Sequence, residues 1–420
     1  MKRLAYLLIC AVMLCGLISL TGCESDKRTE IFVISDTHLG VDDAYAEIGE
    51  NKQALLNFLT MIRNSSTTSE LVIDGDFIDY WFLPAYYEMP ATLSEFDNLV
   101  VKNNQDIFDT INAIISDAQI KVTYVPGNHD QTFNAADVQR ILPGINQARD
   151  AEGLGTYITG ENQEIAMEHG HRYNIFCAPD PLSNRNMVEG RTAIMPAGYF
   201  FTRLATTSVV EGFPATTNTF PQITLKTSDE TQKNYYLYYK VWVAMLSQLP
   251  ISESFSQDII KTNIDGYTKN ISVNDLLPYQ NEDGTIKVKL YDGIVENWPQ
   301  RQKINKVNVL INAADAIAGA PTTEGTDEQA QAQYFDYDSS KKVVVFGHTH
   351  VAKIVKSTNL NGENVIYANT GTWIEKNHDN PSRTYLVITP ASDGFDMKVS
   401  LYQYSEDGTS TLLQEEQLAN

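Results

Sequence analysis

Hydrophobic and polar positions follow a repeating order after about residue 30. Short apolar runs of the kind found in buried strands occupy residues 31–35, 71–73 and 122–125. Each run ends in a cluster of polar residues, and stretches with helical spacing of apolar residues lie between the runs, over about 44–63 and 94–117. Strand, polar loop, helix and strand in this order predict an α/β fold with a layered sheet. The polar groups then gather at the carboxyl ends of the strands.

The same pattern returns near the C-terminus. Residues 343–346 and 365–367 are again short apolar runs that end in polar clusters. Alternating strands over 385–388 and 397–402 close the chain. The N-terminal and C-terminal parts of the chain therefore share this pattern of strands followed by polar loops, which predicts that both contribute to one fold.

The segment between these two parts, residues 181–340, has a different character. It is rich in Tyr, Phe, Asn and Thr and carries an aromatic run at 235–239. One interpretation is the packed core of a helical subdomain, and the other is an apolar lid over a site on the sheet. We expect a large, mainly helical cap insertion in which Tyr199, Phe200 and Phe201 face the cleft.

Composition excludes several classes of protein. Of 420 residues, 43% are hydrophobic and 20% are charged, which excludes wholesale disorder, a collagen-like repeat and a polytopic membrane protein. The formal net charge is -22. Such an acidic surface repels nucleic-acid phosphates, so we expect no nucleic-acid partner.

The N-terminus has the layout of a secretory signal. Lys2 and Arg3 precede an apolar stretch over residues 4–20 that is short for a membrane span. The stretch runs into a Leu-Thr-Gly-Cys sequence ending at Cys23, which resembles the bacterial lipobox. The alternative is an uncleaved signal anchor. We expect lipidation of Cys23 and an extracytoplasmic protein that is lipid-anchored to a bacterial membrane, facing the periplasm or the cell surface.

The cysteine count agrees with this organisation. Residues 1–22 would be the signal peptide and residues 23–30 a tether, which leaves Cys177 as the one free thiol of the mature chain. An intrachain disulfide is then impossible. We expect Cys177 to be a small core residue rather than a nucleophile.

Candidate chemistry lies in the polar clusters after the strands. Six of the seven histidines occur there, and His378 is the exception. Together with nearby Asp and Asn residues they form a candidate ligand set: Asp36, His38, Asp76, Asn128, His169, His348 and His350. Carboxylate, amide and imidazole ligands without a thiolate suit two divalent ions, with Mn²⁺ preferred and Fe, Zn²⁺ or Ni²⁺ as alternatives. Seven ligands are too many for one ion. Two ions ~4 Å apart can activate a water and clamp phosphoryl oxygens.

The motifs that hold these residues resemble, in order, those of the calcineurin-like metallophosphoesterases. The matching motifs are Asp36-x-His38, Gly75-Asp76-x-x-Asp79, Gly127-Asn128-His129-Asp130, His169-Gly170-His171 and Gly347-His348-Thr349-His350. The resemblance implies a layered β-sandwich flanked by helices, with its two core parts at 31–180 and 341–420. It also implies a hydrolase of phosphoester or pyrophosphate bonds.

The resemblance further implies roles for individual residues. Asp36, His38 and His350 would hold one metal ion. Asn128, His169 and His348 would hold the other, and Asp76 would bridge both. A metal-bridging hydroxide would be the nucleophile. His129 would protonate or stabilise the leaving oxygen, with Asp130 behind it fixing its tautomer.

The roles of some residues beside the predicted ligands are open between two interpretations. Asp79 is either the start of a helix or a partner of a metal ligand, and His171 either supports a ligand or faces the substrate. Asp74 is expected only to end a strand. Asn377-His378-Asp379 imitates the asparagine motif but lacks its glycine and preceding strand, so we expect a loop there.

The substrate is left open by the sequence. Residues 35–40 together with His169-Gly170 resemble the UDP-2,3-diacylglucosamine diphosphatase group, whose insertion receives acyl chains. Those enzymes work in the cytoplasm, and the insertion here has no obvious counterpart in them. We therefore expect a phosphorylated small molecule, sugar or lipid-linked substrate.

Two other classes of function compete with this hypothesis. The first is an extracytoplasmic binding or scaffolding lipoprotein on a phosphoesterase fold, against which the intact ligand positions argue. The second is another two-metal hydrolase such as an amidohydrolase. Amidohydrolases begin with a His-x-His pair, whereas this chain begins with Asp36-x-His38.

Overall fold

The fold is described by a computed structural model of the chain. It describes residues 28–117, 119–183, 195–263, 268–377, 379–392 and 395–419. The predicted signal peptide, Cys23 and His378 lie outside these residues. In the described part of the chain, no helix is long and apolar enough to cross a membrane.

Two β-sheets form the centre of the molecule. The larger sheet has seven strands, in the order β16 (Ser410–Leu418), β15 (Met397–Tyr404), β14 (Thr384–Thr389), β1 (Glu30–Ile34), β2 (Thr68–Asp74), β3 (Lys121–Val125) and β4 (Asn146–Gln147). Strands β1 to β4 run parallel, and β14 to β16 add to β1 as antiparallel neighbours. Val33 pairs with Val72, and Val72 pairs with Thr123.

The smaller sheet has five strands. Their order is β12 (Lys353–Thr358), β13 (Asn364–Asn369), β11 (Val343–Phe346), β6 (Ile165–Met167) and β5 (Tyr157–Thr159). Strand β11 runs parallel to both β6 and β13, with Val343 opposite Ile165 and Ile366. The loops after β6 and β11 therefore leave the sheet at the same edge.

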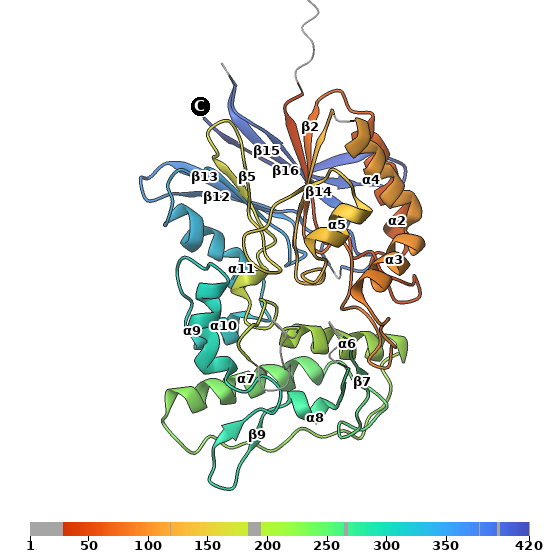
Figure 1. The fold of residues 1–420 in the computed structure, drawn as a ribbon. Coiled ribbons are helices and arrows are strands. Elements are labelled where there is room, and N and C mark those ends of the chain that lie inside the picture. Colours follow the sequence, from red (N-terminus) through yellow and green to blue (C-terminus); the bar gives the residue numbers. More distant parts are fainter. Residues whose placement is uncertain are drawn as a thin grey trace, which may run out of the picture.

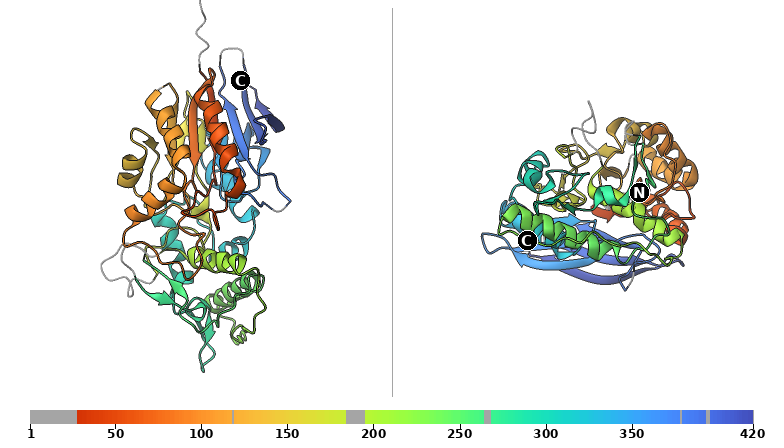
Figure 2. Two further views of the ribbon diagram at one scale, coloured as in Figure 1. Left: turned by 90° about the vertical axis from the view of Figure 1, so that its right-hand side faces the viewer. Right: turned by 90° about the horizontal axis from the view of Figure 1, so that it is seen from below.

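Apolar side chains join the two sheets face to face. This inner layer includes Ile31, Val33, Val72, Ile165, Val343, Val345, Ile366 and Leu386. Helices α2 (Lys52–Arg63), α3 (Leu93–Asn103), α4 (Gln105–Asp117) and α5 (Ala135–Ile141) cover the outer side of the larger sheet (Figure 1). Figure 2 shows these helices on one side of the C-terminal strands in both views. Two sheets flanked by helices confirm the predicted α/β fold class.

The predicted helical stretches are present with two differences. The first helix begins later than expected, at Lys52 after the single turn η1 (Gly49–Asn51), and the stretch over 94–117 is divided at Asn104 into α3 and α4. In α2, the residues Leu55, Phe58, Leu59 and Ile62 are fully buried against the sheet, since they recur every three or four positions. Helix α3 begins after Thr92, whose side chain accepts a hydrogen bond from the backbone N–H of Glu95 at 3.1 Å.

The outer side of the smaller sheet is covered by a short segment just before β11. This segment contains α11 (Glu324–Asp327) and the single π-helical turn η3 (Gln331–Phe335). Ala330 and Phe335 pack there against Val344, Phe346 and Tyr367. Residues near 324–335 therefore belong to the packing of the core, although the sequence places them in the insertion.

A separate lobe is built from most of the predicted insertion. It contains α6 (Ala197–Val210), α7 (Glu230–Leu246), α8 (Val273–Leu276), α9 (Ile294–Ile304), α10 (Ala313–Gly319) and the two-stranded pairs β7 (Ile260–Lys261) with β8 (Asn270–Ile271) and β9 (Tyr279–Gln280) with β10 (Ile286–Lys287). Figure 1 shows this lobe at one end of the molecule, and the start of β1 lies at the other. We call it the cap.

The aromatic run of the insertion forms the core of the cap. Tyr235, Tyr238 and Trp242 on α7 are buried, and the ring of Tyr238 stacks on Phe176 with centroids 5.1 Å apart. This packing favours the interpretation as a subdomain core. Met245, at the end of the same helix, lines the cavity described below.

Candidate metal centre

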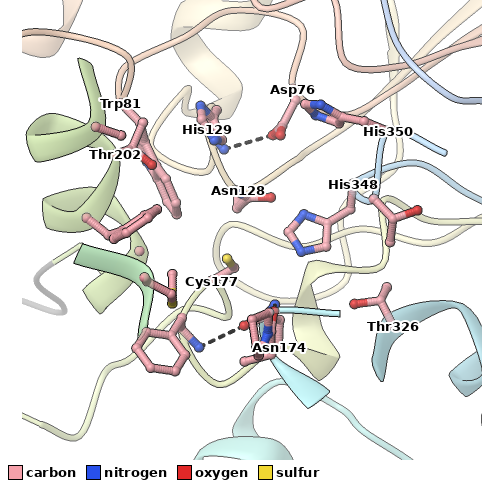
Figure 3. Close-up of a pocket in the computed structure, with 18 of the residues that line it drawn as sticks. Asp76, Trp81, Asn128, His129, Asn174, Cys177, Thr202, Thr326, His348 and His350 are labelled. Atoms are coloured by element: carbon pink, nitrogen blue, oxygen red, sulfur yellow. Dashed lines mark hydrogen bonds between the residues drawn. The ribbon is translucent and has the colours of Figure 1, made fainter. Parts of the chain in front are cut away.

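All seven predicted ligands meet at one edge of the two sheets. Each follows the carboxyl end of a strand: Asp36 and His38 after β1, Asp76 after β2, Asn128 after β3, His169 after β6, and His348 and His350 after β11. The two sheets face each other, so these loops converge from both sides. Figure 3 shows four of these residues around one pocket: Asp76, Asn128, His348 and His350.

One group of donors surrounds Asp36. The Nε2 atom of His350 lies 3.1 Å from Asp36 Oδ1 and 3.2 Å from Nε2 of His38. The three side chains offer donor atoms within 4.8 Å of one another. This spacing fits a single bound cation between them.

A second group surrounds His169. Its Nε2 atom lies 3.1 Å from Asp76 Oδ2 and 3.2 Å from Asn128 Oδ1. Asp76, His169 and His348 again offer donors within 4.8 Å. Asp76 Oδ2 also lies 3.8 Å from Nε2 of His38, which belongs to the first group. The carboxylate of Asp76 therefore lies between the two groups, as a bridging ligand requires.

The backbone of the ligand loops is unusual. Five of the seven predicted ligands have positive φ angles: Asp36 (53°), His38 (46°), Asp76 (49°), His348 (67°) and His350 (60°). Non-glycine residues rarely adopt this conformation, which costs roughly 1–3 kcal/mol for each residue. Strain of this kind persists where the surrounding structure enforces it and is typical of functional sites.

Two motif glycines permit the close packing of these loops. A Cβ atom on Gly127 would lie 2.1 Å from Oδ1 of Asp76, and one on Gly75 would lie 2.4 Å from Nδ1 of His169. Any side chain at either position would displace a predicted ligand. The glycines of the motifs thus serve the geometry of the site.

Hydrogen bonds to the outer ring nitrogens set the orientation of two histidines. Nδ1 of His169 donates to the backbone carbonyl of Asp74 at 2.8 Å, and Nδ1 of His38 donates to Asp79 Oδ2 at 2.9 Å. Each Nε2 then faces the centre, where it could bind a metal ion once it has lost its proton. Asp36 Oδ1 also points there, a buried carboxylate oxygen without a hydrogen-bond partner among the described residues. This donor set fits two divalent cations.

The ionisation of the donors agrees with cation binding. Burial alone would raise the pKa of Asp36, but the charges of His169 and His350 outweigh it and hold that pKa well below its usual range. Burial opposes charge on His169, yet the carboxylates of Asp76 and Asp36 raise its pKa to about 10. Burial and the nearby charge of His169 lower the pKa of His348 to about 3. The centre thus holds ionised carboxylates that attract positive charge.

His129 lies beside the donors and faces the cavity. Its backbone N–H donates to Asp76 Oδ1 at 2.8 Å (Figure 3), and its ring stacks on Trp81 with centroids 4.5 Å apart. Nδ1 of the ring donates to Asp79 Oδ1 at 2.9 Å. Asp79 is therefore a partner of His129 and also of the ligand His38.

The prediction that Asp130 fixes the tautomer of His129 is wrong. The two carboxylate oxygens of Asp130 accept backbone N–H groups, from Gly127 at 2.6 Å and from Phe77 at 2.8 Å. Asp130 thus holds the loop after β3 against the loop after β2. The ring of His129 has Asp79 as its carboxylate partner instead.

His171 and Asp74 lie behind the centre. His171 is fully buried, donates from Nε2 to the carbonyl of Gly153 at 3.0 Å, and lies outside the lining of the cavity. Burial lowers its pKa well below the usual range. It therefore supports its neighbours and does not face a substrate. Asp74 contributes its backbone carbonyl to His169 at the end of β2.

A cavity of about 390 Å³ opens onto the donors. One wall includes the hydroxyl of Thr202 but is otherwise mainly apolar, and it comes mainly from the cap and the loop after β2: Trp81, Phe82, Phe176, Phe201, Ala205 and Met245. The other wall is rich in hydroxyl groups and includes Thr322, Thr323, Thr326 and Thr349. A ligand that fills the cavity therefore meets an apolar surface on one side and a polar surface on the other.

The sequence-based prediction for the cap aromatics holds for one residue of three. Phe201 lines the cavity, whereas Tyr199 and Phe200 are buried in the packing of α6. On a helix, three successive residues point in different directions, so they cannot share one face. Cys177 also lines the cavity, but burial raises the pKa of its thiol to about 12, which is unsuitable for a nucleophile.

Two residues of the site were missed by the sequence analysis. Glu47 lines the cavity, with Oε2 3.4 Å from Nδ1 of His38. No motif marks it, because it reaches the site from a loop of irregular structure. Trp81 stacks on His129. It lies two positions after the motif that ends at Asp79, and this closeness in sequence could have marked it as a residue of the site.

The two groups of donors together form a centre that could hold metal ions. Residues 29–198 match the calcineurin-like phosphoesterase family, Metallophos. This part of the chain is therefore similar to a family of phosphoesterases. This match confirms the resemblance found in the sequence over the part of the chain that it covers.

Other comparisons add little. No curated protein matches the chain. Among solved structures, a conserved uncharacterized protein from Streptococcus pneumoniae TIGR4, a predicted phosphoesterase, is 9% identical, with 93% of this chain and 98% of that chain covered and a TM-score of 0.29. Nuclease MPE of Pseudomonas putida is 16% identical, with 37% of this chain and 56% of that chain covered and a TM-score of 0.20. We draw neither fold nor function from similarities of this size.

Proposed function

We propose that the protein is a dinuclear-metal-dependent hydrolase of phosphoester or pyrophosphate bonds. The observation that carries this proposal is the convergence of Asp36 and Asp76 with four histidines in two adjacent groups at the edge of both sheets. Asp36, His38 and His350 would hold one ion, and Asn128, His169 and His348 the other. Asp76 lies between the groups and would contact both ions.

Two bound divalent ions would lower the pKa of a water molecule and withdraw charge from the phosphoryl oxygens. Mn²⁺ is the ion we propose first, because the donors are oxygen and imidazole nitrogen without thiolate. Fe, Zn²⁺ and Ni²⁺ remain alternatives for elemental analysis to decide.

His129 would donate a proton to the leaving oxygen. Burial opposes a charge on its ring, but Asp79 and Asp76 outweigh burial and raise its pKa. The ring therefore holds its proton to a higher pH than an ordinary histidine does. Because Nδ1 is bound to Asp79, Nε2 is the nitrogen that can give its proton to a leaving group in the cavity.

The walls of the cavity support an amphipathic ester as the substrate. Phe201 and Met245 offer apolar contacts, and Thr323 and Thr326 offer hydroxyl groups on the opposite side. A phosphorylated sugar or a lipid-linked phosphoester has both characters. The bond that is cut could be a monoester, a diester or a pyrophosphate, and kinetics must distinguish these.

The test is a substrate screen with purified protein. Protein loaded with Mn²⁺ should hydrolyse nitrophenyl phosphomonoesters or diesters, and a chelator should abolish this activity. A protein that binds two Mn²⁺ ions but hydrolyses none of the mono-, di- and pyrophosphate esters offered would instead support the alternative, a binding or scaffolding lipoprotein.

We also propose that the protein is extracytoplasmic and anchored by lipid on Cys23. This proposal rests on the sequence of residues 1–23, which lie outside the described part of the chain. The variant Cys23→Ser should leave the membrane fraction while its hydrolytic activity in vitro stays unchanged. Unaltered membrane partitioning would favour an uncleaved anchor.

A further inference from the structure

The loop that carries His348 and His350 contacts a segment of the predicted insertion. That segment is α11, which includes Thr326 on the cavity wall and Asp327 directly after it. Asp327 is almost fully buried, at 6% exposure. It lies between the hydroxyl-rich wall and the smaller sheet, where a carboxylate needs partners to offset its loss of hydration.

Asp327 has four polar partners. Its Oδ1 atom accepts hydrogen bonds from the hydroxyl of Tyr367 at 2.5 Å, the hydroxyl of Thr349 at 3.3 Å and the side-chain amide of Asn369 at 3.3 Å. Its Oδ2 atom forms an ion pair with Lys353 Nζ at 2.5 Å. These partners come from β12, β13 and the ligand loop, so one carboxylate joins three parts of the smaller sheet to the cavity wall.

Two of these contacts bear directly on the ligand loop. Thr349 is the residue between the predicted ligands His348 and His350. Asn369 donates to the carbonyl of Gly347 at 2.7 Å and to the hydroxyl of Thr349 at 3.1 Å. Both flanks of His348 are therefore held by a network that ends at Asp327.

The backbone of this loop requires such support. His348 and His350 both have positive φ angles, at 67° and 60°. A non-glycine residue keeps this conformation only when surrounding contacts enforce it. The network around Asp327 supplies contacts of this kind at Gly347 and Thr349.

The position of the cavity wall is fixed by the same segment. The side-chain amide of Asn174 donates to the carbonyl of Ala320 at 3.0 Å. A Cβ atom on Gly325 would lie 2.3 Å from the carbonyl oxygen of Gly319, so α11 packs tightly on the end of α10. Movement of the wall at Thr326 would therefore move Asp327 and its partners.

We propose that Asp327 is a positioning residue that couples the hydroxyl-rich wall of the cavity to the loop carrying His348 and His350. Asp327 contacts none of the predicted metal ligands and does not line the cavity. It acts on the ligand loop through Thr349 and Asn369. An effect of Asp327 on hydrolysis depends on the proposed function. An effect of Asp327 on metal binding can be measured without hydrolysis.

The test compares two substitutions at this position by Mn²⁺ titration of metal-free, folded protein. Asp327→Ala removes every contact and should weaken binding of one of the two Mn²⁺ ions by ~10-fold or more, the range seen when partners of metal ligands are lost. Asp327→Asn keeps an oxygen that can accept from Tyr367, Asn369 and Thr349. It should therefore retain Mn²⁺ affinity within a few-fold of the wild type, by the same reasoning.

Asp336→Ala is the matched control. It removes one negative charge from the same segment, but Asp336 is exposed and bonds to Gln331 instead of the loop. Its Mn²⁺ affinity should be unchanged. If Asp327→Ala is folded and binds both ions as tightly as the wild type, the proposal is overturned. Equal losses in Asp327→Ala and Asp327→Asn would also overturn it, since they would assign the effect to the ion pair with Lys353.

A second variant guards against misfolding of Asp327→Ala. Thr349→Val removes only the hydroxyl that contacts Asp327 directly and leaves the route through Asn369, so it should weaken binding of the same Mn²⁺ ion to a smaller extent. Unchanged affinity in Thr349→Val would contradict the proposal. Because these readouts are metal affinities, a failure to find a hydrolysable substrate would count against the proposed function and leave this inference standing.

Discussion

The carboxylate of Asp79 lies between the rings of His38 and His129. Its Oδ2 atom is 2.9 Å from Nδ1 of His38, and its Oδ1 atom is 2.9 Å from Nδ1 of His129. Oδ1 also accepts the backbone N–H of Trp81 at 2.7 Å. One buried carboxylate thus orients a predicted metal ligand and the predicted acid together.

Removal of this carboxylate should impair both functions. Asp79→Ala leaves the rings of His38 and His129 without their acceptor, so we expect Mn²⁺ affinity and kcat each to fall by ~10–100-fold. Mn²⁺ titration and steady-state kinetics measure the two losses. Circular dichroism should show an intact fold, and Asp43→Ala, an exposed change in the loop after β1, serves as the control. A folded Asp79→Ala protein with normal affinity and kcat would contradict this account.

His129 should separate chemistry from metal binding. His129→Ala removes the proton donor but none of the predicted ligands, so kcat should fall by ~10²–10⁴-fold while metal content is kept. Elemental analysis and kinetics with one ester measure this. Loss of metal from the variant would make His129 a ligand.

The loss of kcat in His129→Ala should depend on the leaving group of the ester, which provides a control for the role of His129 as an acid. A good leaving group departs with little protonation, so the loss of kcat should be smaller for activated nitrophenyl esters than for alkyl esters. Equal losses for good and poor leaving groups would argue against the acid role.

Asp97 should make stability depend on pH. Burial raises the pKa of this carboxyl to about 7, although the hydroxyl of Tyr80 donates to it. In the unfolded chain the pKa returns to the ordinary value of 3.8. Between these values the folded protein holds a proton that the unfolded chain has lost. The contribution of Asp97 to stability is therefore full below about pH 4 and disappears as the pH rises through about 7.

Asp97→Asn tests this dependence. The amide cannot ionise but keeps an oxygen for Tyr80, so the melting temperature of the variant relative to the wild type should increase from pH 5 to pH 8. Thermal melts at several pH values measure the difference. A difference that stays constant with pH would show that Asp97 does not titrate in this range.

The convergence of the predicted ligands could be predicted from the sequence because each of them lies directly after a strand. Parallel strands bring their carboxyl ends to one edge, so local motifs such as those at Asp36 and His348 are enough to place them together. The partner of His129 could not be predicted this way. Asp130 is its neighbour in sequence, but a turn directs that carboxylate to the backbone N–H groups of Gly127 and Phe77.

The C-terminal boundary of the insertion could not be predicted from the sequence either. Composition places residues 181–340 together, yet α11 and η3 cover the smaller sheet and contact the ligand loop through Asp327. Packing between segments distant in sequence decides this, and no local pattern records it. The cap aromatics illustrate the same limit, because burial in α6 separates Tyr199 from Phe201.

The most direct test of the dinuclear centre is the metal content and turnover of Asp76→Asn. The carboxylate of Asp76 lies 3.1 Å from Nε2 of His169 and 3.8 Å from Nε2 of His38, and its negative charge offsets the repulsion between two dications. The amide keeps the shape of the side chain but not the charge. Elemental analysis should therefore find at least one metal ion lost per chain, with nearly all hydrolysis abolished. Two ions per chain in an active Asp76→Asn protein would contradict the two-metal account.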